Sequence, residues 1–417
     1  MYRLLAIAMV IEGLGLGPSG RAAAQHDDAG AVTFDQALDL GVRVPAARAP
    51  ARALEARGQE ELGAVGASAQ PRVQVMPGYR FSPGPAQGLD LQITVTQSWS
   101  LAGLARARRD AATEERAVLL AEARAQSLAH RLEAAHAWIA RWTLERRLEV
   151  VAEEVAASRA LLAAVVAARQ VGERTLRDES LARAHAAETT LHAVDLDGVA
   201  YEAGLALALE RGRTDGRPVG TSGAPPAPEL PDPALRAVLE GRVGSLPAVR
   251  AEELRALAAR ARAAEVAVAG SGATATLGAS YQRESPGSSI GFLVAGLTVP
   301  VFDLSTRAEA AAREAAARAD AGAEQLRLEA RSELALAQHE VEHTREVERT
   351  VREELLPALE EALAQTEALL GVGEATLWQL LDARRQAAEA RDRQRTAEGA
   401  HVWAVVRAWL LYAEIAR

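Results

Sequence analysis

The sequence predicts a mainly α-helical fold with a small β part, arranged as two tandem repeats of short helix, β-hairpin, long helix, glycine turn and helix. The first observation is the motif Val-Gly-Glu-x-Thr-Leu, which occupies residues 171–176 and returns at 372–377. Self-similarity at a fixed offset indicates a duplication. The second is composition, because Ala, Leu, Glu and Arg dominate and only 4% of the residues are aromatic. This mixture favours long coiled helices over a globular core.

Residues 1–24 have the pattern of a signal peptide. Arg3 precedes an apolar run at 4–16, and three alanines stand before Gln25, which is an A-x-A type of cleavage site. We therefore expect the chain to be exported. It contains no cysteine, which excludes disulfides, thiolate metal sites and a lipidated-cysteine anchor. No later segment offers the roughly 20 uninterrupted apolar residues of a membrane-spanning helix.

The first repeat is assigned to residues 25–213. Alternating apolar and polar residues around Ile93 predict a strand with one apolar face. The glycine of the Val-Gly-Glu motif can adopt the backbone angles that end one helix and let the next fold back. The expected elements are a short helix from Phe34 to about Ala64, strands at about 72–81 and 89–99, and a helical hairpin at 104–213.

The second repeat, at 233–417, follows a linker at 214–232 whose Gly-Ala-Pro-Pro-Ala-Pro stretch continues neither helix nor sheet. Pro357 is expected to kink the long helix of this repeat locally. The long helix of each hairpin measures roughly 100 Å at 1.5 Å per residue. The expected elements are a helix at 233–268, strands at about 274–282 and 291–301, and a helical hairpin at 305–416.

Four strands per chain constrain how the protein could sit in a membrane. Strands of ~9–11 residues cross a bilayer when tilted, but a spanning sheet must close because lipid cannot satisfy an open edge. Outer-membrane barrels need an even number of strands, at least ~8, so two chains would supply eight and three would supply twelve. The strands therefore predict an oligomer, and the residues alone leave its size open.

The chain resembles the TolC-type outer-membrane factors of tripartite efflux pumps and type I secretion systems. Segments 94–99 and 296–302 look like the strand-to-helix segments of that family, and 171–172 and 372–373 look like its hairpin tips. The resemblance covers essentially the whole chain after the signal peptide. It implies a homotrimer with an α-helical barrel in the periplasm and a twelve-stranded transmembrane β-barrel in the outer membrane of a Gram-negative cell.

The same resemblance implies a passive channel, and it indicates which residues would form its functional sites. An inner-membrane pump would supply the energy and a periplasmic adaptor would contact the tips, with no cofactor. The periplasmic entrance would lie at Gln379 and Asp382, and Asp178 occupies the related region of the first repeat. Asp382 could instead be a helix-surface residue paired with Arg385 or Gln386. The tip residues are Val171, Gly172, Glu173, Val372, Gly373 and Glu374.

Other functions have weaker support in the sequence. The net charge of −9 repels nucleic acid. His339-Glu340-Val341-Glu342-His343 matches the zinc-protease pattern H-E-x-x-H, but it sits midway along a charged helix and lacks the extended motif that supplies a third ligand. The G-x-S-x-G match at 287–291 precedes a strand, so it predicts a hairpin turn. A periplasmic coiled-coil adaptor is the main alternative, although adaptors carry one helical hairpin. We therefore predict a non-enzymatic protein.

Overall fold

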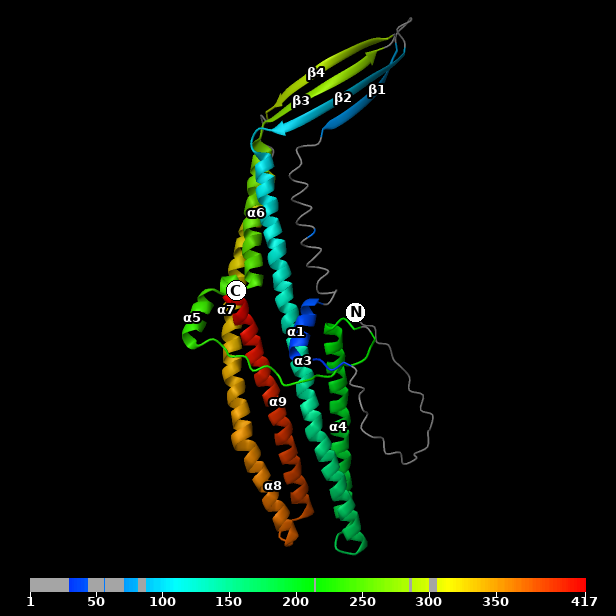
Figure 1. Cartoon of the computed structure of the whole chain (residues 1–417), viewed down its shortest axis with the longest axis vertical. Coiled ribbons are helices and arrows are strands. Elements are labelled where there is room, and N and C mark those ends of the chain that lie inside the picture. Colours follow the sequence, from blue (N-terminus) through cyan, green and yellow to red (C-terminus); the bar gives the residue numbers. More distant parts are fainter. Residues whose placement is uncertain are drawn as a thin grey trace.

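The computed structural model describes residues 30–43, 56, 71–81, 88–213, 215–284, 287–299 and 306–417. The molecule is elongated, with a β-sheet at one end, two helix-to-helix turns at the other and long helices between them (Figure 1). The expected signal peptide and, apart from residue 56, the part of the first short helix after residue 43 lie outside the described residues.

Four strands form one antiparallel sheet in the order β1-β2-β3-β4. The two halves of the chain therefore meet in the sheet, through the pairing of β2 with β3. Gly287 N–H donates to Glu284 O (2.8 Å) and closes a shorter turn than the sequence predicted, which is why the last strand starts earlier than expected. The strands are β1 (Arg72–Arg80), β2 (Gly88–Ser100), β3 (Thr274–Glu284) and β4 (Ser288–Thr298).

Across β1, β2 and β3 the register gives one mainly apolar and one mainly polar face, whereas β4 carries apolar residues on both. Val75 lies opposite Ile93, and Ile93 lies opposite Tyr281 on the next strand, so these side chains share a face. On the other face the hydroxyls of Thr94 and Ser280 are hydrogen-bonded at 2.8 Å. The apolar face is not covered within the described chain, since Val75 and Tyr281 are both exposed.

The first helical hairpin consists of α3 (Leu104–Gln170) and α4 (Leu176–Glu210). Gly103, at φ 77°, precedes α3, a backbone angle that side chains with a Cβ rarely adopt. α3 extends from the sheet to the far turn, and α4 returns along its lower half (Figure 1). Helix α1 (Phe34–Arg43) packs beside α3 at mid-length.

The second half contains the same kinds of element with two interruptions. The helix expected at 233–268 is in fact two α-helices joined by a 3₁₀ turn, because glycine weakens the helix at Gly241 and Gly244 and Pro247 has no amide hydrogen to continue it. The elements are α5 (Pro233–Gly241), η1 (Val243–Ser245), α6 (Pro247–Ser271), α7 (Thr306–Thr350), η2 (Val351–Leu355), α8 (Leu356–Gly371) and α9 (Leu377–Ala416).

The second interruption, η2, is a π-helical turn directly before Pro357. Proline cannot donate a hydrogen bond and its ring clashes with the carbonyl four residues earlier. The wider turn accommodates it, and Leu356 N–H bonds to Val351 O five residues back. The predicted local distortion at Pro357 is therefore present as a π-turn on its N-terminal side.

Shorter helices follow one another beside the long ones. α6 packs against α3 and α7 near the sheet, whereas α9 packs against α7, α8 and α3 toward the turns. The hydroxyl of Ser245 donates to Ile415 O (3.1 Å) and fixes the start of α6 at the end of α9. The described part of the predicted linker, 215–232, contains no helix and only the parallel bridge of Thr221 with Val32.

Candidate functional site at the helical tips

Both helix-to-helix turns use glycine in a left-handed conformation. Gly172 has φ 83° and Gly373 has φ 80°. Glu173 N–H bonds to Ala168 O (2.9 Å), and Glu374 N–H bonds to Leu369 O (2.9 Å). These are the six-residue closing bonds of a glycine-terminated helix, which satisfy carbonyls that would otherwise lack a partner. The two tips are therefore local copies of one turn.

A capping box starts the returning helix at each tip. Thr175 N–H donates to Asp178 Oδ2 (3.0 Å), and Asp178 N–H donates back to Thr175 Oγ1 (3.1 Å). The second tip repeats this exchange. Thr376 N–H donates to Gln379 Oε1 (2.8 Å), and Gln379 N–H donates back to Thr376 Oγ1 (3.3 Å). Two predicted entrance residues thus have a structural task that sequence reasoning missed, although the spacing Thr-x-x-Asp and Thr-x-x-Gln is a sequence signal for it.

Acid is expected to loosen the first tip and not the second. The backbone hydrogen bond from Thr175, followed by the hydroxyl bond, holds the pKa of Asp178 below its ordinary value. Asp178 therefore stabilises the fold above the ordinary carboxyl pKa of about 4, and this is lost as pH falls through the lowered value. Gln379 caps without charge and is a built-in control.

The measurement for this prediction is amide hydrogen exchange at Thr175 and Thr376 between about pH 6 and pH 2, corrected for intrinsic rates. Protection at Thr175 should fall with acid, while protection at Thr376 should not. An equal response at the two threonines would contradict the assignment of the effect to Asp178.

The two tips present different side chains to solvent. Val171 and Val372 are both exposed, but Leu176 is 67% exposed whereas its counterpart Leu377 is 2% exposed. Leu377 is buried because it packs in a cluster that joins the two hairpins. The sequence repeat gave no sign of this asymmetry, since the motif is the same in both copies. The cluster consists of Val165, Ala182, Leu377, Leu380 and Leu381.

Asp382 is paired within its own helix. Arg385 Nη2 donates to Asp382 Oδ1 (2.8 Å), and Gln386 Nε2 donates to Asp382 Oδ2 (2.8 Å). The bond to Asp382 and then that to Glu389 raise the pKa of Arg385. These are the two partners named by the surface-residue interpretation of Asp382. In the single chain the carboxylate is therefore already partly neutralised.

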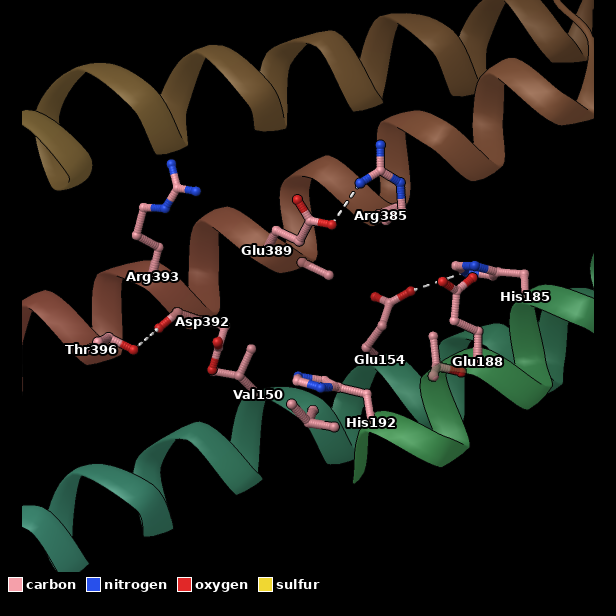
Figure 2. A pocket seen from close by; sticks show the side chains of 13 residues that line it. Val150, Glu154, His185, Glu188, His192, Arg385, Glu389, Asp392, Arg393 and Thr396 are labelled. Carbon is pink, nitrogen blue, oxygen red and sulfur yellow. Dashed lines mark hydrogen bonds and ion pairs between the residues drawn. The ribbon is translucent and has the colours of Figure 1, made fainter. Parts of the chain in front are cut away.

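Above the tips, a cavity of about 530 Å³ separates α3 and α4 from α9 (Figure 2). On its α9 side, Arg147 of α3 binds Asp392 with two hydrogen bonds of 2.7 and 2.9 Å, a bidentate geometry that is stronger than a single contact. The cavity is lined by Val150, Val151, Glu154, His185, Glu188, Thr189, His192, Arg385, Ala388, Glu389, Asp392, Arg393 and Thr396.

The structure does not place the H-E-x-x-H match or the G-x-S-x-G match in the surroundings that their catalytic roles require. His339 and His343 are exposed, and their rings are stacked with centroids 6.0 Å apart. Glu340, between them in the sequence, accepts a hydrogen bond from Arg407 (2.7 Å). A base held by an arginine on a solvated helix does not form a zinc-protease cleft. Of the 287–291 match, only Gly287 lies in the turn between β3 and β4, and residues 288–291 belong to β4, so the predicted turn covers less of the match than expected.

One other group of metal-type donors lies among the described residues. Donor atoms of His130, Glu133 and Glu210 all lie within 4.8 Å of one another. Burial and then the nearby Glu133 raise the pKa of Glu210. His130 and Glu133 are one turn apart on α3 and already form a contact of 3.2 Å between Nδ1 and Oε2.

None of the described helices has the length and apolar character needed to cross a bilayer.

No family model and no curated protein sequence matches this chain. Solved structures do match in fold. A membrane protein from Pseudomonas aeruginosa has a TM-score of 0.78 at 19% identity, covering 95% of this chain and 99% of that one. The outer membrane protein VceC from Vibrio cholerae has a TM-score of 0.75 at 18% identity, covering 92% and 95%. The open state of the MtrE outer membrane channel of Neisseria gonorrhoeae has a TM-score of 0.74 at 16% identity, covering 91% of this chain and 88% of that one.

The chain therefore has the fold of outer-membrane channels over nearly its whole length. This confirms, for the fold, the resemblance to TolC-type outer-membrane factors and the prediction of a mainly helical protein with a small antiparallel sheet.

Proposed function

We propose that the chain is the subunit of an outer-membrane channel for efflux or secretion, a passive conduit from the periplasm to the exterior. The observation that carries this proposal is the uncovered sheet at the end of a long helical body. Its strands contain 9, 13, 11 and 11 residues, enough to cross a bilayer when tilted. Lipid would contact the apolar face that includes Val75 and Tyr281. Water would contact the face that carries Thr94 and Ser280.

The two open sheet edges and the channel fold support a trimer. In the described chain β1 and β4 each pair on one side only, and lipid cannot satisfy the free backbone groups on the other side. We propose that β1 of one copy pairs with β4 of the next, so three copies make a twelve-stranded barrel. Leu191, Val194 and Tyr201 are exposed on α4 at helical spacing, as expected of a helix that packs against another copy.

The tips are the proposed contact with a periplasmic adaptor, through which an inner-membrane pump would drive export. A Cβ added at Gly172 or Gly373 would meet no atom within 4 Å, so another backbone has room to approach both turns. The valines beside them offer apolar contacts, while Glu173 and Glu374 offer charge. Since Asp178 and Gln379 are capping residues, Asp382 is the remaining candidate for an entrance charge. Pairing with Arg385 would weaken the field of three such carboxylates.

Membrane fractionation followed by sizing in detergent tests this function. We expect the protein in the outer-membrane fraction, as a trimer that dissociates on heating. A soluble monomer in the periplasm would overturn the channel proposal and favour the adaptor interpretation. Because the chain has no cysteine, single cysteines at Glu173 and Glu374 can carry a cross-linker in the same cells. Cross-links from both tips to a periplasmic protein are expected, and cross-links from neither would remove the tip assignment.

A further inference from the structure

A second cavity, of about 440 Å³, lies where α3, the start of α6 and the end of α9 meet. We call it the arginine cavity, because four arginine side chains line it against a single carboxylate side chain, that of Glu414. This local excess of positive charge runs against the net charge of the chain, which is −9. The four arginines are Arg124, Arg131, Arg250 and Arg417.

The one carboxylate of the cavity is shared between two arginines. Glu414 Oε2 lies 3.2 Å from Arg417 Nη1 and 3.8 Å from Arg131 Nη1, so only the first of these contacts is short enough for a hydrogen bond. Arg250 pairs with Glu253 (3.2 Å), which lies outside the cavity wall. Arg124 has no ion-pair partner within the described ranges. The cavity therefore keeps positive charge that the chain itself does not balance.

Arg131 is the arginine of this cavity that lies furthest from water. Its side chain is only 18% exposed, and its guanidinium group donates no hydrogen bond to any described residue. Burial and then the like charge of Arg417 lower the pKa of Arg131, and Glu414 offsets this only in part. A guanidinium group in such a place is stabilised by hydrogen-bond acceptors that carry negative charge. An anion in the cavity would supply both.

The side chains come from positions that suit the binding of one ligand. Arg124, Ser127 and Arg131 follow one another at steps of three and four along α3, so they lie on one face of that helix. Arg250 comes from α6, and Arg417 follows the end of α9. Guanidinium groups bind oxyanions through paired, charge-assisted hydrogen bonds, and the Ser127 hydroxyl is a further donor in the same wall.

The position of the cavity restricts the source of such an anion. Helix α6 begins at the cavity and ends next to the sheet, and its 25 residues span roughly 37 Å. Figure 1 places the start of α6 and the end of α9 at mid-length, away from the sheet. The headgroup of a lipid in a membrane that the sheet crosses would not reach this place, so the chemistry of the site calls for a soluble anion.

We propose that the arginine cavity binds a small soluble oxyanion of the phosphate class, with two or more negative charges. Arg131 and Arg417 bind its oxygen atoms, while Arg124 and Arg250 add positive charge at the rim. Glu414 competes with the ligand for the first two arginines. The bound anion would hold α3, α6 and α9 together where they meet.

Calorimetric titration of the full-length chain with inorganic phosphate tests the proposal, in a neutral detergent at low, constant ionic strength balanced with chloride. We expect one phosphate per chain. Arg131→Gln should weaken phosphate binding by about tenfold or more, the effect of losing a charge-assisted hydrogen bond. Arg124→Gln should weaken it by at least about threefold. Because Arg124 is exposed, this second variant keeps the test valid even if Arg131→Gln does not fold.

Two further variants distinguish this cavity from general attraction to a basic surface. Glu414→Gln removes the competing carboxylate and should tighten phosphate binding by about threefold or more. Arg331→Gln is the matched control, because it removes the same charge as Arg131→Gln from an exposed side chain in the adjoining cavity, which shares Ser245 with this one. We expect Arg331→Gln to bind phosphate within about twofold of the parent.

Three results would overturn the proposal. The first is a parent chain that does not bind phosphate, which would leave the four arginines as a solvated basic surface. The second is equal weakening in Arg331→Gln and Arg131→Gln, since the attraction would then be diffuse. The third is weaker phosphate binding in Glu414→Gln, because a carboxylate that competes with the anion cannot also support its binding.

Discussion

Replacing Gly399 with leucine is expected to destabilise the chain by about 3 kcal/mol or more, because it forces apart α3 and α9 where they cross. A Cβ on Gly399 would overlap Thr143 Oγ1 and lie 2.6 Å from its Cγ2 and 2.9 Å from its Cβ. Thr143 cannot easily turn away, since its hydroxyl donates to Ile139 O (2.8 Å) in its own helix. Chemical unfolding followed by helical circular dichroism measures the loss.

Smaller substitutions at the same crossing separate overlap from other effects. Gly399→Ala should cost about 1–3 kcal/mol, although alanine favours helix more than glycine does. Adding Thr143→Ala should recover part of that cost and not all of it, because the Cβ of residue 143 stays. In a double-mutant cycle, the variant with both Gly399→Ala and Thr143→Ala should therefore lose less stability than the sum of the two single variants.

Gly322→Ala is the control for this crossing, since a Cβ there would meet only Glu252 Oε1, at an ordinary contact distance of 4.0 Å. Within α7 this change should stabilise by up to about 1 kcal/mol. If Gly399→Ala stabilised the chain as Gly322→Ala does, the close crossing of α3 and α9 would be wrong.

The regular elements could be predicted because their signals are local. Alternation around Ile93 placed β2, and the repeated Val-Gly-Glu motif placed both tips, since each depends on neighbouring residues only. The break of the helix predicted at 233–268 was missed although Gly241, Gly244 and Pro247 are visible in the sequence. The predicted helix ran through these residues, although glycine weakens a helix and proline ends one.

The candidate sites were less predictable, because their contacts join distant parts of the chain. The cavity brings Glu154 and His185 together with α9, and no local pattern reports which helices are neighbours. The pairing of Asp382 with Arg385 and Gln386 could be proposed from helix spacing. Helix spacing alone does not decide between this pairing and a free carboxylate at the entrance, and the contacts of Asp382 with Arg385 and Gln386 decide it. The same holds for the buried Leu377 and the exposed Leu176, which are identical in the repeat and differ only in their neighbours.

The second large effect is expected at Trp138, which connects three separate segments at mid-length. Its side chain is 0% exposed, its ring meets Phe34 of α1 edge-on at 5.5 Å, and its Nε1 donates to Val32 O (2.6 Å). Val32 in turn holds the linker, because Ser222 N–H also donates to Val32 O (3.0 Å). Trp138→Ala should therefore cost about 3–5 kcal/mol and release Val32 and Ser222 in hydrogen exchange before the rest of α3 opens.

Two companion variants decide whether that loss comes from packing or from the indole hydrogen bond. Trp138→Phe keeps most of the ring, and Val32 O keeps the bond from Ser222, so no buried carbonyl is left without a donor. We therefore expect a loss of only about 1 kcal/mol. Trp378, which is 60% exposed at the second tip, is the matched control, and Trp378→Ala should stay within about 0.5 kcal/mol of the parent. Equal losses for Trp138→Ala and Trp378→Ala would rule out Trp138 as the residue that joins α1, α3 and the linker.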